Sequence, residues 1–271
     1  NGAINTSNDG PFTLVNSDAV TIAAAADMTL AGAFDQSGGG AITTSGDITT
    51  TAAAIHFTDA VTLASDVALT SADGAITIDS TIDGEQALTL VAGAGDITLS
   101  GPVGGITRLG IFTITSAEDV TADAITASNI VQTDATGTAT YGALDTDAVA
   151  GISLSGAAFV LEGAVNTDAS GTFTLVNSGS ATIAGAMTLT GAFDQSGGGD
   201  VTLSADITTT ADAIDFTDAV TLGADVVLTS AGGDIAFDGT IDGANALTLV
   251  AGSGDITLSS AVGASTRLGV F

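Results

Sequence analysis

The chain repeats itself, and this repetition limits its fold more than any other feature of the sequence. Residues 12–17 (Phe-Thr-Leu-Val-Asn-Ser) recur as residues 173–178, a shift of 161 positions. Residues 32–40 recur unchanged as residues 191–199, a shift of 159 positions. A fixed period of this length is typical of a protein built by stacking similar structural units.

The repeat divides the sequence into one full unit and part of a second. Residues 1–112 match residues 162–271, whereas residues 113–161 occur once. The full unit is therefore 1–161. Because the pattern is interrupted within its second unit, we expect a longer array, in which residues 1–271 form one continuous solenoid.

A second, shorter period lies within each unit. Runs of apolar–Thr–apolar alternate, as short strands with one buried face do. Ile55, Ile76 and Ile97 illustrate the spacing, since each lies 21 positions after the one before. Other series with the same step are Val61, Ile82, Val103; Val67, Leu88, Leu109; Ile214, Ile235, Ile256; Val220, Ile241, Val262; and Val226, Leu247, Leu268.

Three short strands in each 21-residue rung predict an all-β fold, a triangular parallel β-helix (β-solenoid). Each strand is expected to pair with the same strand of the neighbouring rungs, about 4.8 Å away. The Thr between two apolar residues should face solvent. Gly84, Gly105 and Gly243 should occupy inward positions where a side chain would be crowded. From Ile97 to Ile152 the sequence fits three shorter rungs of about 18 residues.

The charge excludes several partners. The chain has 31 acidic residues against two basic ones, Arg108 and Arg267, and a formal net charge of −29. A chain without Lys cannot neutralise phosphates, so nucleic acid and anionic lipid are excluded as electrostatic partners. It has no Cys, and no run of about 18 apolar residues that would predict a membrane span.

Two rungs carry a resemblance to a known family. Residues 86–99 (Gln-Ala-Leu-Thr-Leu-Val-Ala-Gly-Ala-Gly-Asp-Ile-Thr-Leu) and their counterpart 245–258 resemble repeats of the filamentous-haemagglutinin-like β-helical adhesins, giant bacterial surface proteins. The resemblance implies export, a right-handed β-helix, and a role as a cell-surface fibre, stalk or adhesin. It contains no catalytic signature.

The acidic residues raise the question of calcium. Residues 21 apart should lie one above the other, so a calcium ladder would place Asp on Asp. Among the regular rungs only Asp194 with Asp215, and Asp234 with Asp255, do so, and these four are the candidate Ca²⁺ ligands. Elsewhere the acidic residues are staggered, which favours solvated turns. No other cofactor is predicted.

His56, the only histidine, is expected on the outer surface next to Asp35, with Asp215 as its counterpart in the second unit. An exposed surface His is the favoured interpretation over a catalytic group. Because Arg108 and Arg267 hold equivalent positions, a structural ion pair or a cap on a turn carbonyl is favoured over an active-site role.

We therefore expect a structural, extracellular repeat rod at a bacterial surface that is not an enzyme. Its expected partners are further copies of the repeat, joined covalently or end to end. The alternative is a binding module for a glycan, a surface protein or Ca²⁺-bridged partners. The uniform sign of the charge would oppose side-by-side association.

Overall fold

The computed structural model describes residues 2–271 and has two compact units, residues 1–138 (the first unit) and 139–271 (the second unit), whose boundary differs from that of the sequence repeats 1–161 and 162–271. The described residues form 35 short strands and no helix. Consequently they contain no helix that is long and apolar enough to cross a membrane. That residues 1–271 form one continuous solenoid stays a prediction.

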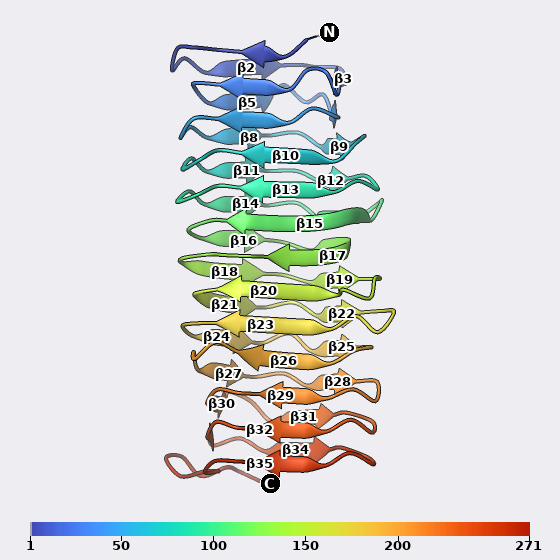
Figure 1. Cartoon of the computed structure of the whole chain (residues 1–271), viewed down its shortest axis with the longest axis vertical. Coiled ribbons are helices and arrows are strands. Elements are labelled where there is room, and N and C mark those ends of the chain that lie inside the picture. Colours follow the sequence, from blue (N-terminus) through green and yellow to red (C-terminus); the bar gives the residue numbers. More distant parts are fainter. Residues whose placement is uncertain (1) are drawn as a thin grey trace. The chain divides into compact units, whose positions relative to one another are not determined.

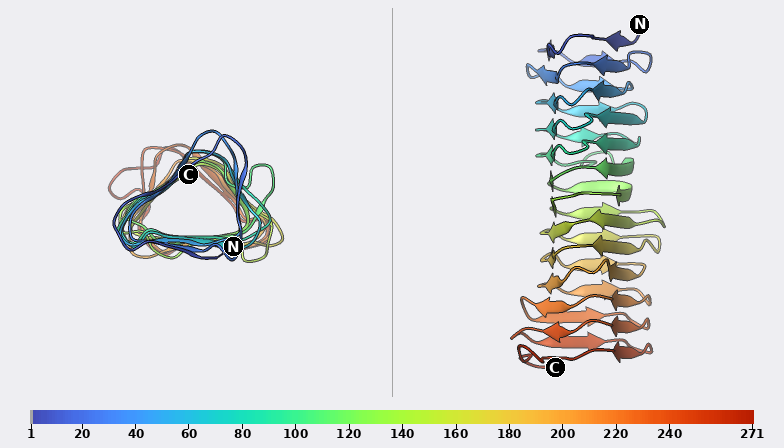
Figure 2. Two further views of the ribbon diagram at one scale, coloured as in Figure 1. Left: turned by 90° about the horizontal axis from the view of Figure 1, so that it is seen from above. Right: turned by 60° about the vertical axis from the view of Figure 1, so that its left-hand side comes forward.

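Both units are stacks of rungs with three parallel strands each (Figure 1). Viewed along the stacking direction, the rungs of each unit have a triangular outline (Figure 2). The predicted fold class, a parallel β-solenoid with three strands per rung, is confirmed.

In the first unit the strands form three faces, A, B and C. Face A contains β1 (Ile4–Asn5), β4 (Met28–Leu30), β7 (Ile48–Thr50), β10 (Val67–Thr70), β13 (Leu88–Val91), β15 (Leu109–Ser116) and β17 (Ile125–Gln132). Face B contains β2 (Phe12–Val15), β5 (Phe34–Ser37), β8 (Ile55–Phe57), β11 (Ile76–Ile78), β14 (Ile97–Leu99) and β16 (Val120–Ala122). Face C contains β3 (Val20–Ile22), β6 (Ile42–Thr44), β9 (Val61–Leu63) and β12 (Ile82–Asp83).

The second unit has three corresponding faces, and β18 (Thr138–Tyr141) lies at the boundary in the sequence. One face contains β19 (Leu144–Thr146), β22 (Val165–Thr167), β25 (Met187–Leu189), β28 (Ile207–Thr209), β31 (Val226–Thr229) and β34 (Leu247–Val250). The next contains β20 (Ile152–Gly156), β23 (Phe173–Asn177), β26 (Phe193–Ser196), β29 (Ile214–Phe216), β32 (Ile235–Phe237) and β35 (Ile256–Leu258). The third contains β21 (Ala158–Leu161), β24 (Ala181–Ile183), β27 (Val201–Leu203), β30 (Val220–Leu222) and β33 (Ile241–Asp242).

Most strands are three residues long, and their first and third side chains point into the core while the middle one points outward. In β9 the side chains of Val61 and Leu63 are buried and Thr62 is exposed. The predicted 21-residue step is confirmed where Ile76 pairs with Ile55 and with Ile97. It also holds in the second unit, where Ile235 pairs with Ile214 and Ile256.

The step from Leu88 is longer than 21 residues, and there the prediction was wrong. Leu88 pairs with Phe112 and not with Leu109, the residue that the regular step predicts. The extra residues form an outward loop after Val103, where Asp83 accepts hydrogen bonds from the N–H groups of Ile106 and Thr107 at 2.8 and 2.9 Å.

The second unit has the same longer step. The N–H group of Leu247 donates to the carbonyl of Val270, so Phe271 and not Leu268 lies opposite Leu247. Asp242 accepts from the N–H groups of Ser265 and Thr266, as Asp83 does in the first unit.

Two further sequence expectations need correction. Gly84 and Gly243 are buried as predicted, but Gly105 is exposed and its neighbour Gly104 is buried instead, because the outward loop begins there. The rung that follows Ile97 places Val120 beside it, so this rung is longer than the regular step, whereas the sequence predicted a shorter one.

Aromatic rings form part of the core of each unit. In the first unit the ring of Phe34 lies 6.0 Å from that of Phe12 and 4.9 Å from that of Phe57, centroid to centroid. In the second unit Phe173, Phe193, Phe216 and Phe237 form a longer column with centroid separations of 5.7, 4.8 and 4.9 Å. These distances are in the range of favourable aromatic pairs.

Candidate functional site

His56, the only histidine of the chain, lies at the outward position of β8, between strands β5 and β11 of the first unit. His56 lies between Asp35 on the preceding rung and Thr77 on the following rung. Its Nδ1 atom is 3.1 Å from Oδ1 of Asp35, and its Nε2 atom is 2.9 Å from Oδ2 of Asp79. Both ring nitrogens therefore face a carboxylate, an arrangement that suits the doubly protonated imidazolium.

The two carboxylates favour the charged form of His56. The hydrogen bond to Asp79 is the largest influence and raises the pKa of His56 above 6.5. Partial burial acts in the opposite direction, and Asp35 adds to the increase. The sequence predicted Asp35 as a neighbour but missed Asp79, which lies two residues beyond the position directly stacked on His56.

The equivalent position in the second unit is Asp215, which pairs with Asp194 on the preceding rung. Partial burial is the largest influence and raises the pKa of Asp215 above its ordinary value. The carboxylates of Asp194, Asp238 and Asp234 raise it further. Carboxylates are thus close together around Asp215, whereas the equivalent position in the first unit holds a histidine between two carboxylates.

The four predicted calcium ligands are only partly brought together. Asp194 and Asp215 lie side by side on β26 and β29. Asp234 instead accepts a hydrogen bond from the backbone N–H group of Asp255 at 2.8 Å. Within residues 2–271 no group of three or more His, Asp or Glu side chains is arranged to hold a metal ion. Calcium binding by these residues stays a prediction.

Many other acidic residues have a structural role that the sequence analysis missed. Their carboxylates accept a hydrogen bond, 2.8 to 3.1 Å long, from a backbone N–H group of the next rung. Pairs separated by 21 residues are Asp47–Ala68, Asp66–Ala87, Asp73–Ala94, Asp206–Val227, Asp225–Ala246 and Asp234–Asp255. Such charge-assisted bonds tie each rung to the next at its corners.

A buried polar ladder lies at one corner of each unit. In the first, Nε2 of Gln36 donates to Oδ1 of Asn16 and to Oδ2 of Asp59, both at 2.9 Å. In the second, Gln195 donates to Asn177 at 2.8 Å and to Asp218 at 2.9 Å. Gln36 and Gln195 are fully buried. The ladder satisfies these buried groups and gives both units the same corner geometry.

The glycines next to this ladder are required by the backbone. Gly38 has a φ of +118°, and a Cβ atom there would lie 2.6 Å from the carbonyl oxygen of Asn16. The N–H group of Gly39 donates to Oδ2 of Asp59 at 2.8 Å. This glycine-rich segment thus forms a tight corner against the preceding rung.

The two arginines differ in their surroundings although their positions are equivalent. Nη1 of Arg108 donates to the carbonyl oxygen of Ala127 at 2.8 Å, so it caps a backbone carbonyl, but this carbonyl lies in β17 and not in a turn as predicted. Arg267 is exposed. The sequence given contains no second-unit counterpart of Ala127, since residues 113–161 occur once.

Comparisons with known proteins give no match: no family model, no curated protein and no solved structure is significantly similar to the chain. The chain is therefore characterised by its fold, that of a β-helical repeat protein.

Proposed function

We propose that the chain is a structural repeat region of a long extracellular fibre, stalk or adhesin at a bacterial cell surface, and that it performs no catalysis. The observation that supports this most directly is that both units build the same rungs from the same inward residues and the same polar ladder. Replicated rungs extend a structure, whereas an active site needs particular groups placed once.

The physical basis of such a role is neighbour-to-neighbour stacking. Parallel strand pairing, apolar columns and Asp-to-backbone hydrogen bonds all join one rung to the next. A net charge of −29 would keep neighbouring fibres apart, because like-charged surfaces repel each other.

The finer assignment, to the filamentous-haemagglutinin-like adhesins, is supported by the resemblance of residues 86–99 and 245–258 to their repeats. In this proposal the chain acts as a rigid acidic spacer, its partners are further copies of the repeat, and ligand binding resides elsewhere in the fibre.

The mass of the native polypeptide tests this function. An antibody raised against the 271-residue chain should detect, under denaturing conditions, a protein of several hundred kilodaltons that is removed when intact cells are treated with protease. A native band no larger than the chain itself would contradict a covalent fibre. Resistance to protease in intact cells, with digestion after lysis, would contradict a surface location.

A second candidate function, a Ca²⁺-dependent binding module, is favoured by one observation. Asp194 and Asp215 lie on adjacent strands, and Asp234 and Asp238 are near enough to raise the pKa of Asp215. A cation that bound there only in the folded state would raise the melting temperature.

The test compares melting in millimolar CaCl₂, MgCl₂ and EDTA. A Ca²⁺-specific increase that is lost in Asp194→Asn, and kept in the matched first-unit variant Asp35→Asn, would support a site in the second unit. Equal melting in all three solutions would reject it. A glycan array probed with the same chain tests the glycan alternative.

A further inference from the structure

One sheet face of each unit has no charged side chain at the outward positions of three adjacent described strands. In the first unit these strands are β4, β7 and β10, and in the second they are β25, β28 and β31, which are equivalent in the repeat. We call these the neutral faces. Their outward residues are Thr29, Thr49, Ala68 and Thr70 in the first unit, and Thr188, Thr208, Val227 and Thr229 in the second.

The face that follows along the chain, here the charged face, differs in this respect. Its outward positions hold Asp35 and His56 in the first unit, and Asp194 and Asp215 in the second. The chain has 31 acidic residues, yet both units keep charge off the neutral face. Since the inward residues build the rung, this shared outward pattern favours contact with an uncharged partner.

The threonines of each neutral face form a continuous file. Thr49 pairs with Thr29 on one side and with Thr70 on the other. The second unit repeats this pairing, with Thr208 at the centre. Adjacent strands are about 4.8 Å apart, so each file presents one hydroxyl and one methyl group per rung at that interval. Because β-branching restricts χ1, the array is rigid before a partner arrives.

The hydroxyl groups of these files are available to a partner. In the same strands the inward Thr50 and Thr209 donate to the carbonyl oxygens of Ala53 and Asp212. Within residues 2–271 the outward threonines of the neutral faces make no such bond to the protein. Each of these hydroxyls can therefore donate to and accept from an external hydrogen-bonding surface.

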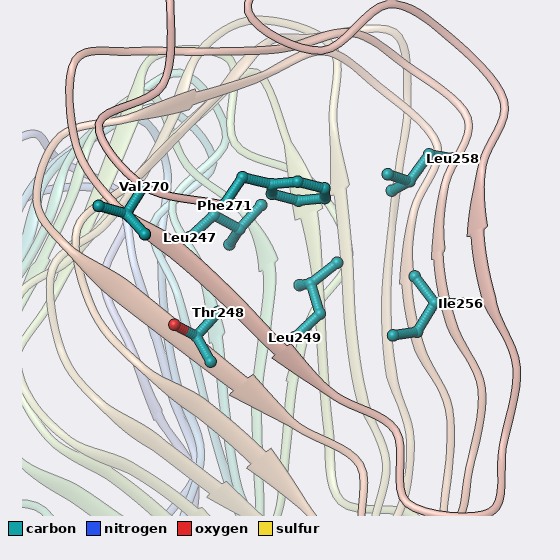
Figure 3. Close-up of a pocket in the computed structure, with 7 residues that line it drawn as sticks. All are labelled: Leu247, Thr248, Leu249, Ile256, Leu258, Val270 and Phe271. Carbon is teal, nitrogen blue, oxygen red and sulfur yellow. The ribbon is translucent and has the colours of Figure 1, made fainter.

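The shape of the neutral faces suits a flat partner. The strands of each unit lie along the sides of a triangular outline (Figure 2). The hollow shown in Figure 3 lies elsewhere, and none of its lining residues belongs to a neutral face. No aromatic ring, on which a sugar could stack, occupies an outward position of these six strands. A matching partner is flat, uncharged, periodic and able to form hydrogen bonds.

We propose that the neutral faces adsorb to ice. The surface of ice is an uncharged lattice of hydrogen-bonding oxygen atoms, and its repeat is close to the spacing of adjacent β-strands. One hydroxyl per rung can therefore meet one lattice position after another, while the methyl groups exclude liquid water between them. An ionic mineral would instead favour a charged face. This activity is additional to the spacer role proposed above, which it neither requires nor replaces.

The third face of each unit has a similar but narrower file. In the first unit Thr43 pairs with Thr21 and Thr62, and each strand has one outward position. The file ends at Asp83, whose carboxylate holds the outward loop. A charge and a loop at its end make this face less suited to a flat lattice, and it serves as a comparison in the test.

Partition into growing ice tests the inference on the intact 271-residue chain. A dilute solution is frozen slowly from one side, and the chain is measured in the ice and in the remaining liquid. The unaltered chain should be enriched in the ice at least tenfold more than the double variant Thr49→Tyr/Thr208→Tyr. Tyrosine suits a strand, but its ring prevents close contact of the file with a lattice. Each single variant should lose part of the enrichment, because the other unit keeps its face.

A second variant tests neutrality without added bulk. Thr49→Asp/Thr208→Asp places carboxylates on the neutral faces, as Asp194 and Asp215 already lie on the charged face, and it should lose the enrichment to the same extent. Rejection of the unaltered chain by ice would overturn the inference. So would equal enrichment of the unaltered chain and of either double variant.

Matched variants on the other faces locate the contact. Thr77→Tyr/Thr174→Tyr on the charged face should keep the enrichment, and so should Thr43→Tyr/Thr202→Tyr on the third face. Loss in the third-face variant with retention in Thr49→Tyr/Thr208→Tyr would overturn the assignment to the neutral faces. Sedimentation with crystalline cellulose tests another flat, uncharged partner, and binding to cellulose by a chain that ice rejects would overturn the assignment to ice.

Discussion

His56 in the first unit and Asp215 in the second occupy the same place in the same framework. Behind them the aromatic columns agree closely, with centroid separations of 4.9 Å for Phe34–Phe57 and 4.8 Å for Phe193–Phe216. The Gln-to-Asn distances of the two polar ladders, 2.9 and 2.8 Å, agree equally well. The local charge differs at two places, since His56 corresponds to Asp215 and Ala75 corresponds to Asp234. The difference teaches that inward residues determine the rung, while outward positions can vary in chemistry.

The largest effect is expected from substitutions of inward-facing core residues, which test whether the core is built in the same way in both units. Ile76→Asp and Ile235→Asp each place a charge at a fully buried, equivalent position. Each should cost at least about 3 kcal/mol of stability, because an unpaired buried carboxylate is strongly unfavourable. Urea unfolding measures the cost, and hydrogen exchange should show lost protection around the altered rung. Unchanged unfolding of either variant would contradict the 21-residue register there.

A smaller loss is expected when the polar ladder is broken. Gln36→Leu and Gln195→Leu remove the donor shared by an Asn and an Asp, and should each cost about 1–3 kcal/mol because buried acceptors lose their partner. The two costs, measured by urea unfolding, should be similar. Thr208→Leu, at an exposed outward position, is the control and should have little effect. Very different costs would show that the corners are not equivalent.

Exchanging the outward residues sharpens the comparison. Asp215→His places an imidazole between Asp194 and Asp238, as His56 lies between Asp35 and Asp79. Near pH 6 it should stabilise the chain by up to about 1 kcal/mol, the range of exposed ion pairs. The melting temperature at pH 6 checks this, and Asp215→Asn separates removal of repulsion from new attraction. An Asn variant as stable as the His variant would argue against the ion pair.

The smallest effect is the pH dependence. Because folding raises the pKa of His56, its stabilisation is complete below pH 6.5 and is lost as the pH rises through the folded-state value. The pKa of Asp215 is also raised, so its contribution is complete below pH 3.8 and is lost as the pH rises above that. NMR titration of the His56 ring checks the first statement. His56→Gln should remove the corresponding slope in stability, and an unshifted titration would contradict it.

Much of the fold follows from the sequence because apolar residues at a fixed step leave few alternatives. The spacing of Ile55, Ile76 and Ile97 predicts the pairing that the structure has. The position of Leu109 was predicted wrongly because a loop after Val103 lengthens the rung, and a loop that turns outward leaves no trace in the apolar pattern.

The candidate site was less predictable, because its contacts run diagonally. Residues 21 apart stack directly, but Asp79 is 23 residues from His56, and Asp59 is 23 residues from Gln36. Asp79 directly follows β11, and Asp59 lies two residues after β8, so each carboxylate reaches back from the end of a strand to a side chain of the preceding rung. A search for polar pairs at both separations would have found these contacts. The hydrogen bonds from Asp carboxylates to backbone N–H groups give no such signal, since any residue can supply the donor.

The equivalence of the two polar ladders has a consequence for recombination between the repeats of the gene. The N–H group of Thr58 donates to the carbonyl of Gln36, and that of Thr217 donates to the carbonyl of Gln195. A recombination event that joined Phe57 directly to Thr217 would therefore give Thr217 the acceptor that Thr58 had before. Unequal crossing-over between repeated stretches of the gene can thus lengthen or shorten the protein by whole repeats. The rungs on either side of the junction then keep the same type of neighbour, with the same backbone hydrogen bonds.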